Sequence, residues 1–470
     1  MSNVLTPDQA ARPRPVALRE AFGYWLKLGF ISFGGPAGQI SMMHQELVER
    51  RRWISEQRFL HALNYCMVLP GPEAQQLATY IGWLMHGTAG GIIAGTLFVL
   101  PSLFILIALT WIYLALGDVP AVAGVLYGIK PAVTAIVVFA AYRIGTRALK
   151  NSALWTLAAA AFVAIAVFDA PFPYIVLGAA LVGFFGARIA PDKFKAGGHH
   201  GSGKKISGPA LIDDATPVPD YARLKWARVA TYSAVGLLIW AGVLGALFAA
   251  FGWDAVLTQM GWFFTKAALL TFGGAYAVLP YVYQGGVNDY SWLTGPQMID
   301  GLALGETTPG PLIMVVAFVG FVGGWTKELF GTESLAVAGM AGAAVATFFT
   351  FLPSFLFILV GAPAVERTRH EIGFTGPLTA ITAAVVGVIL SLAVFFAYHV
   401  LWPGGFAVTW AWGNSAAFVA ALATGFEWFS ALISVAAFVA LWRYKAGVIP
   451  VIGACAAAGL VWVLVVKPLL

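Results

Sequence analysis

Long apolar runs recur along the whole sequence, and most of them approach the roughly 20 residues that a helix needs to cross a lipid bilayer. Backbone N–H and C=O groups find no water inside a bilayer, so a segment that crosses it pairs these groups within a helix. The chain is 60% hydrophobic and 10% charged, far from the composition of soluble domains. The sequence therefore predicts an all-α polytopic membrane protein. The runs cover residues 91–116, 119–142, 153–168, 174–188, 229–251, 335–361, 375–399, 428–442 and 448–466.

The two halves of the chain match each other at a constant offset of 239 residues through the first region of each half. Lysine, tryptophan and Pro-Gly-Pro all keep this register, so we interpret the match as an internal repeat. Farther along, after extra residues in the second half, Leu100-Pro101-Ser102 matches Leu352-Pro353-Ser354. The pairs at the constant offset are Lys27 with Lys266, Phe33-Gly34-Gly35 with Phe272-Gly273-Gly274, Trp53 with Trp292, and Pro70-Gly71-Pro72 with Pro309-Gly310-Pro311.

The distribution of lysine and arginine predicts how the repeats lie in the membrane, because basic loops stay on the cytoplasmic side. A cytoplasmic N-terminus places nearly all the basic loops there, and the basic loop at residues 50–52 has no basic counterpart in the second half. We therefore expect two inverted-topology repeats, an arrangement typical of secondary transporters with a substrate site near the midplane. The expected organisation is a cytoplasmic segment 1–16, a first repeat 17–190, a cytoplasmic linker 191–228, an inverting transmembrane helix 229–251 and a second repeat 252–470.

Each repeat begins with two interrupted apolar segments, one broken at Phe-Gly-Gly and the other at Pro-Gly-Pro. Proline removes a backbone donor and glycine permits a tight reversal, so we expect re-entrant helical hairpins or discontinuous helices. The helix N-termini at such breaks offer free N–H groups to an anion inside the membrane. The alternative is that the glycines only let two helices cross closely. The candidate substrate-binding residues at the breaks are Ser32, Gly34, Gly35, Pro70, Gly71, Pro72, Thr271, Gly273, Gly274, Pro309, Gly310 and Pro311.

Two lysines and two glutamates are the charged candidates near these breaks. Lys27 and Lys266 share one register. A lysine in an apolar segment costs free energy unless it has an acidic partner, contacts water or binds a ligand. We interpret them as a pair that serves the anion; the alternative is that Lys27 reaches the membrane surface. Glu73 follows the first Pro-Gly-Pro and Glu306 precedes the second, and the repeat counterpart of each is apolar. We expect these two acids either to take part in proton coupling or to cap broken helices.

The motifs FGGP, RRRW and PGPEAQQ in the first half and TPGP in the second together resemble the chromate ion transporter family in its long, two-domain form. The resemblance covers nearly the whole chain. It implies a multi-pass protein of the bacterial inner membrane that exports chromate, confers chromate resistance and recognises a sulfate-like tetrahedral dianion. In the second half Ala275 stands where Pro36 stands in the first, so the two Phe-Gly-Gly turns need not be equivalent.

The leading expectation is therefore secondary export of chromate by alternating access at a midplane site. Sulfate or another oxyanion is the close alternative, since a site that recognises charge and shape separates such ions poorly. A membrane enzyme is the distant alternative, because the sequence has no HExxH, GxSxG or Walker motif. We expect no cofactor and no metal, and we interpret His199-His200 as an exposed pair in the linker. The expected partners are chromate, with sulfate as the alternative anion, the lipid bilayer and a second copy of the chain in a homodimer. We expect no nucleic-acid partner despite the net charge of +6.

Overall fold

The structure of this chain is a computed structural model that describes residues 13–33, 35–194, 209–213, 216, 219–272, 274–367, 375–404 and 425–469. Over these ranges the backbone is helical, apart from loops and one isolated β-bridge between Ile54 and Ile212. The predicted all-α fold is confirmed.

Seven helical segments of the described residues are long and apolar enough to cross a membrane, which confirms the polytopic prediction. They are Glu73–Leu116 (α4), Pro120–Ala148 (α5), Phe172–Ile189 (α7), Trp226–Phe251 (α9), Thr332–Glu366 (η6, Thr332–Ser334, with α14, Leu335–Arg367), Gly376–Leu401 (in α15, Thr375–Leu401) and Val448–Leu469 (α18, Val448–Val461, with η7, Trp462–Val466, and η8, Lys467–Leu469). Shorter apolar helices are Ser152–Ala166 (α6), Leu312–Thr326 (η5, Leu312–Met314, with α13, Val315–Thr326) and Trp428–Trp442 (α17).

The internal repeat reappears in the bounds of the helices. At the offset of 239 residues, η2 falls on η4 and α3 falls on α12 without a shift at either end. The backbone repeats too: Gly71 and Gly310 have φ of 122° and 106°, and the non-glycine residues Arg52 and Ser291 have φ of 51° and 49°. The paired elements are α1 (Leu18–Ile31) with α10 (Val256–Leu270), α2 (Gly35–His44) with α11 (Ala275–Tyr283), η2 (Gln45–Arg50) with η4 (Gln284–Asp289), and α3 (Glu56–Val68) with α12 (Gly295–Thr307).

The predicted interruptions are present in both repeats. In the first, α1, α2 and α3 have 14, 10 and 13 residues, which is too short to span a bilayer. After Pro-Gly-Pro the chain turns back along the start of α4, then kinks at His86 and Gly87, where φ is −136° and 65°. The rest of α4 is long enough to cross. In the second repeat α13 turns back in the same way and α14 crosses, so each repeat supplies two short helical hairpins and a long helix.

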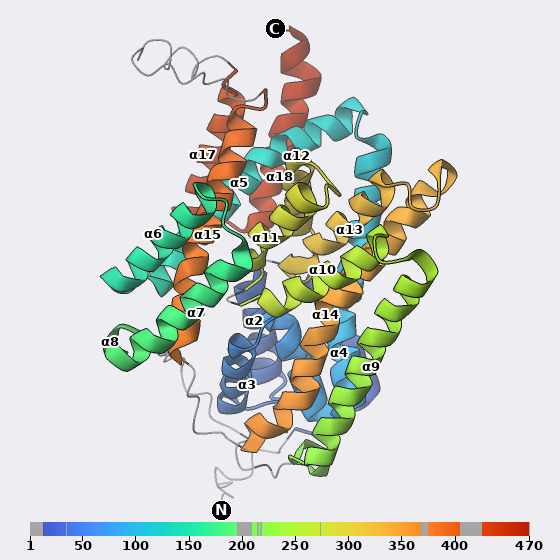
Figure 1. Ribbon diagram of the computed structural model, residues 1–470, viewed down its shortest axis with the longest axis vertical. Coiled ribbons are helices and arrows are strands. Elements are labelled where there is room, and N and C mark those ends of the chain that lie inside the picture. The colour runs from blue at the N-terminus through green and yellow to red at the C-terminus, as the bar shows by residue number, and fades with distance from the viewer. Residues whose placement is uncertain are drawn as a thin grey trace, which may run out of the picture.

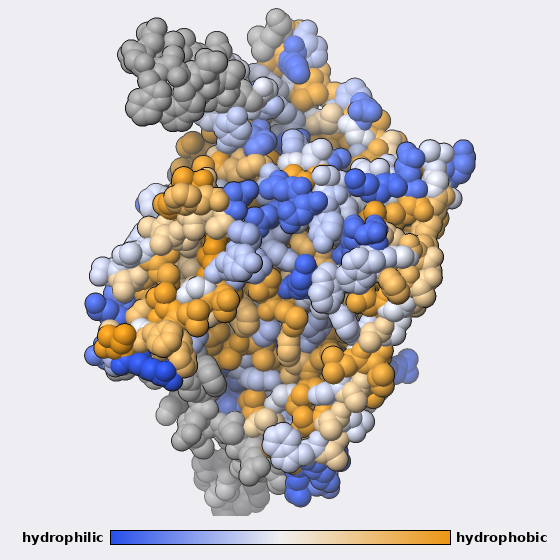
Figure 2. All heavy atoms as spheres, viewed as in Figure 1, coloured by the Kyte–Doolittle hydropathy of each residue, from blue (hydrophilic) through white to orange (hydrophobic). Residues whose placement is uncertain are grey.

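The hairpins of the two repeats lie in opposite halves of the molecule. Figure 1 shows α2 and α3 in the lower half, towards the N-terminus, and α11 and α12 in the upper half, towards the C-terminus. The long helices α4 and α14 pack against each other and join the halves. Figure 2 shows hydrophobic residues over much of the middle of one face, with hydrophilic residues gathered towards its upper and lower ends. This distribution fits a protein whose middle lies in lipid.

Helix α9, the segment between the repeats, lies at one edge of the molecule (Figure 1). It begins at Trp226, three residues before the expected start of the inverting helix at 229. Its side chains are largely uncovered, and Leu237 and Leu238 are 60% and 71% exposed. Apolar exposure on this scale is typical of a helix that faces lipid.

Part of the linker packs against the first repeat. Residues 209–213 run beside the first repeat, where Leu211 N–H donates to Arg52 O at 2.9 Å and Ser55 N–H donates to Ile212 O at 3.0 Å. Ala210 and Ala222 are buried, at 4% and 0% exposure. Paired backbone groups and packed alanines therefore dock this part of the linker onto the first hairpins, although its glycine, proline and charge content resembles that of free loops. Short helices α8 (Pro191–Phe194) and η3 (Asp220–Ala222) flank it.

Candidate functional site

The breaks predicted from the sequence meet in two matching contacts between the repeats. Gly71 N–H donates to Thr271 O at 2.7 Å, and Gly310 N–H donates to Ser32 O at 2.8 Å. Both the donors and the acceptors are related by the offset of 239 residues, so one contact is made twice with the repeats exchanged. Each Pro-Gly-Pro turn therefore lies against the Phe-Gly-Gly break of the other repeat. We call these two contacts the reciprocal break contacts.

The reciprocal break contacts occupy donors that the sequence interpretation left for an anion. The N–H groups of Gly71 and Gly310 are bound to carbonyls of the other repeat, and Pro70, Pro72, Pro309 and Pro311 have no N–H group. The donors that remain at the first turn are the N–H groups at the start of α4, which have no partner within the helix. Gly34 and Gly273 lie outside the described residues, while Gly35 and Gly274 have φ of 67° and 98°.

Ser32 and Thr271 contribute their backbone carbonyls to these contacts, and their hydroxyls are used elsewhere. Ser32 Oγ donates to Leu28 O at 2.5 Å, and Thr271 Oγ1 donates to Ala267 O at 2.7 Å. In this conformation both hydroxyl hydrogens thus close onto their own helices. A direct contact from these hydroxyls to an anion stays a prediction.

Two buried glutamines, which the sequence interpretation did not single out, support the break contacts. Gln39 Nε2 donates to Gly310 O at 2.6 Å and to Ser32 O at 3.2 Å, and Gln76 Nε2 donates to Pro70 O at 2.7 Å. Both are fully buried. They bind carbonyls that a continuous helix would have paired, which reduces the cost of the breaks. The available signal was a polar residue in an apolar segment next to each break.

Two serines on the long helices face the Pro-Gly-Pro glycines. A Cβ atom built on Gly71 would collide with Ser354 Oγ, and one built on Gly310 would lie 2.7 Å from Ser102 Cβ. Ser102 and Ser354 are 0% and 1% exposed, and within the described part of the chain neither Oγ has a hydrogen-bond partner. Sequence analysis aligned them in the Leu-Pro-Ser match but gave them no role.

The two glutamates do not form a matched pair. Glu306 is buried near the end of α12 and accepts a hydrogen bond from Tyr276 Oη on α11, the neighbouring hairpin helix of the same repeat. Glu73 is half-buried and begins α4 directly after the first Pro-Gly-Pro. Their different surroundings agree with the apolar repeat counterparts seen in the sequence. Proton coupling through either acid stays a prediction.

The two lysines also lie in different surroundings. Lys27 is on the exposed face of α1, which also carries Leu26 and Phe30 at 37% and 52% exposure. Lys266 is half-buried, with Nζ 5.9 Å from the centroid of the Trp262 ring. The repeat register therefore does not place both ammonium groups in equivalent burial, and their service to an anion stays a prediction.

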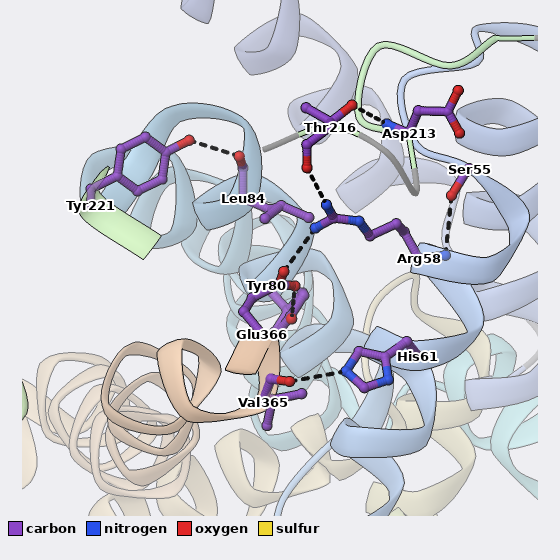
Figure 3. Close-up of polar contacts among 10 residues, drawn as sticks. All are labelled: Ser55, Arg58, His61, Tyr80, Leu84, Asp213, Thr216, Tyr221, Val365 and Glu366. Atoms are coloured by element: carbon purple, nitrogen blue, oxygen red, sulfur yellow. Dashed lines mark hydrogen bonds and ion pairs between the residues drawn. The ribbon is translucent and has the colours of Figure 1, made fainter. Parts of the chain in front are cut away.

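A buried ion pair joins the repeats at the end of the molecule that carries the first hairpins (Figure 3). Arg58 of α3 and Glu366 of α14 have side chains 4% and 2% exposed, with Nη1 and Oε2 2.7 Å apart. Tyr80 Oη donates to the other carboxylate oxygen at 2.5 Å, and Arg58 Nη2 donates to Thr216 O of the linker at 2.8 Å. We call this group the Arg58 cluster. It links the first hairpins, the linker and the end of α14.

A second polar group joins the repeats through α12. Asp300 is 3% exposed, and its carboxylate lies 3.3 Å from Lys130 Nζ of α5 and accepts a hydrogen bond from Tyr113 Oη of α4 at 2.9 Å. We call this group the Asp300 cluster. The sequence interpretation missed Asp300, because nothing local in the sequence marks Lys130 and Tyr113 as its partners. Each cluster binds a hairpin helix of one repeat to a long helix of the other.

A cavity of about 300 Å³ lies away from the break contacts, between α4, α5 and the end of α12. Residues such as Ile112, Val125 and Leu304 line it, and its lining is apolar. An anion gains no stabilisation from such a surface, so the break contacts remain the candidate site. Among the described residues no three His, Cys, Asp or Glu side chains group in a way that could hold a metal, and His199-His200 lies outside the described residues.

Comparison with known sequences assigns the chain to a family. The chromate transporter family matches residues 19–184 and 258–460, which are most of both repeats. The chain belongs to the chromate transporter family. A chromate transport protein of Pseudomonas aeruginosa is 33% identical to this family member over 420 residues, which cover 86% of this chain and 90% of the relative. A chromate transport protein of Cupriavidus metallidurans is 30% identical over 381 residues, covering 81% and 82%.

Some relatives of this chromate transporter family member are shorter. An uncharacterized transporter of Bacillus subtilis is 29% identical over 133 residues, which cover 28% of this chain and 68% of the relative. No solved structure matches the chain. The family and its named relatives indicate a transporter and not an enzyme.

Proposed function

We propose that this protein is a secondary transporter that exports chromate through the bacterial inner membrane by alternating access and so confers resistance to chromate. The observation that carries the proposal is the pair of reciprocal break contacts, Gly71 with Thr271 and Gly310 with Ser32. In transporters with inverted repeats, broken helices meet near the midplane and bind the substrate there. The chromate transport proteins of two bacteria, each at least 30% identical to this chain, support chromate as the substrate.

Alternating access requires that contacts between the repeats break at one end while they hold at the other. The Arg58 cluster and the Asp300 cluster are suited to this role, since each joins a hairpin helix to a long helix of the other repeat. Both clusters are formed in this conformation, so the hairpin helices are held to the long helices of the other repeat at both places. The basic loop at residues 50–52 favours a cytoplasmic position for the Arg58 cluster and for the N-terminus.

The charge of the substrate supports export as the direction of transport. Moving one charge through 100 mV is worth about 2.3 kcal/mol, so a dianion that leaves a negative-inside cell gains about 4.6 kcal/mol. That corresponds to roughly three powers of ten in concentration ratio. Export therefore runs on the membrane potential alone, whereas uptake needs another driving ion.

The test is flux of radiolabelled chromate into everted membrane vesicles with an imposed potential and no pH gradient. Accumulation that follows the potential supports electrogenic export, and its absence in vesicles that contain folded protein refutes it. Competition with unlabelled sulfate in the same vesicles decides the alternative: sulfate that is itself accumulated faster than chromate would make the protein a sulfate transporter.

Proton coupling is a separate part of the proposal and rests on Glu73 and Glu306. A carboxylate near a bound dianion repels it, so protonation on substrate binding would couple the two ions. We expect Glu73→Gln or Glu306→Gln to flatten the pH dependence of chromate flux. If both variants keep the wild-type pH profile, these acids do not couple protons.

A further inference from the structure

We propose that the hydroxyls of Ser102 and Ser354 form a pair of hydrogen-bond donors for the transported oxyanion, one from each repeat. The inference rests on the proposed function, since it assigns substrate contacts to the site at the reciprocal break contacts. Neither serine was recognised from the sequence as a binding residue. The ligand class is a tetrahedral oxyanion, whose oxygens accept hydrogen bonds from neutral hydroxyls.

The first argument is position. Ser354 of α14 lies against Gly71, and Ser102 of α4 lies against Gly310. The approach requires glycine, because a Cβ atom on Gly71 would collide with Ser354 Oγ. Each hydroxyl thus reaches the Pro-Gly-Pro turn of the other repeat, at the points where the reciprocal break contacts form.

The second argument is the state of the hydroxyls. Both serines are buried, and in the described ranges neither Oγ atom has a partner. A buried polar group without a hydrogen bond destabilises the fold, so a functional reason for keeping it is expected. An alanine would fill nearly the same space without that cost, so packing alone does not explain two hydroxyls at matched positions.

The third argument is the contrast with two threonines on the same helices; among the described residues Thr347 of α14 also has an Oγ1 without a partner, but it does not face a Pro-Gly-Pro glycine. Thr350 Oγ1, one turn before Ser354, donates to Ala346 O at 2.7 Å, and Thr110 Oγ1, two turns after Ser102, donates to Leu106 O at 2.6 Å. The hydroxyl hydrogens of these threonines are therefore bound to carbonyls of their own helices. The hydroxyls of Ser102 and Ser354 make no such hydrogen bond, although each helix has a carbonyl four residues earlier that could accept one. Their hydrogens therefore remain available to a ligand.

A dianion enters this site when a break contact opens. Separation of Gly71 from Thr271 frees one backbone N–H beside Ser354, and separation of Gly310 from Ser32 frees another beside Ser102. Each break then offers a hydroxyl and an amide hydrogen to the same oxyanion. Neutral donors of this kind bind an oxyanion without a fixed positive charge, which allows release at the other side.

The test compares Ser102→Ala, Ser354→Ala and the double variant with wild type in proteoliposomes. The matched control is Thr350→Val, which removes a buried hydroxyl of α14 that is satisfied within its helix. Rates of chromate and sulfate flux give KM and maximal rate at one fixed pH, so that the charges of Glu73 and Glu306 do not vary. The Tm of each purified variant is measured without anion and with increasing sulfate.

We expect each serine variant to raise the KM by about ten-fold or more, as for the loss of a hydrogen bond to a charged ligand. The same rise in Tm should then require about ten-fold more sulfate. The Tm without anion and all properties of Thr350→Val should stay close to wild type. Unchanged KM and unchanged sulfate response in the double variant would overturn the inference while leaving chromate transport intact. Wild-type protein that binds sulfate through the serines but moves no chromate would instead overturn the proposed substrate and support the serine site.

Discussion

The buried ion pair between Arg58 and Glu366 makes a sharp prediction about stability. The two side chains are 4% and 2% exposed, so removing one leaves the other charge buried without its partner. Such a loss costs about 3–5 kcal/mol, which at about 1.4 kcal/mol per power of ten is a factor of roughly a hundred to several thousand in the folding equilibrium. Glu366→Ala also removes the acceptor of Tyr80 Oη. We therefore expect Glu366→Ala and Arg58→Ala to be among the most destabilising single substitutions in the chain.

The measurement is the free energy of unfolding in detergent by denaturant titration for both single variants and for the double variant Arg58→Met/Glu366→Leu. The double variant should recover most of the loss, because an apolar pair leaves no uncompensated charge. The matched control is Asp220→Ala, which breaks an exposed ion pair to Arg223 whose side chains are 80% and 64% exposed and should change stability by less than about 1 kcal/mol. Single variants within about 1 kcal/mol of wild type, or a double variant as unstable as the sum of the singles, would refute the reasoning.

The same variants test whether the Arg58 cluster closes one end of the protein. Cys66 of α3 is fully buried, and replacing Cys455 by alanine leaves it as the single thiol. We expect Glu366→Ala to increase the rate at which a maleimide modifies Cys66 under native conditions. If Glu366→Ala loses stability but Cys66 is modified at the wild-type rate, the ion pair stabilises the fold and does not close this end of the protein.

Three further predictions concern the breaks, the Asp300 cluster and the lysines. Gly71→Ala should lower the free energy of unfolding by about 2 kcal/mol or more in the same titration, because the φ of 122° and the Ser354 hydroxyl both exclude a Cβ atom. The control is Gly242→Ala in α9, where nothing in the described part of the chain lies within 4 Å of the added Cβ atom. This variant should be neutral or stabilising. Asp300→Asn should cost less stability than Glu366→Ala, because Lys130 is 33% exposed and keeps water when its partner is neutral; an equal or greater loss would contradict this order. Lys27→Ala and Lys266→Ala should raise the KM for chromate with little change in unfolding free energy, and wild-type KM values in both would remove the lysines from the site.

Much of the fold was predictable because its signals are local. Apolar length predicted the spanning helices, and glycine and proline predicted the breaks, whose positions recur in the bounds of α3 and α12. The register of Gly71 and Gly310 predicted that the two turns would be alike. These features depend on residues close in sequence, so one chain without relatives sufficed to find them.

The contacts that define the site were not predictable in the same way. Gly71 meets Thr271, and Arg58 meets Glu366, across distances in sequence that no periodicity reports. The repeat register correctly identified which residues are equivalent but not which ones touch. It carried no information on burial either, since Lys27 and Lys266 share a register and differ in exposure. Equivalent backbone positions on two repeats need not have equivalent neighbours.

The two repeats share a backbone contact and differ in the side chains around it, and this difference bears on mechanism. The matched positions His61 and Asp300 illustrate it: His61 Nε2 lies 3.3 Å from Val365 O, whereas Asp300 binds Tyr113 and Lys130. If the repeats were identical, conformations open to either side would have equal free energy. Under the alternating access proposed above, the backbone contact made twice would supply the two alternative states, and the unequal clusters would set their relative populations. Substitutions in the clusters should shift the balance between the states, while substitutions at the break contacts should impair both.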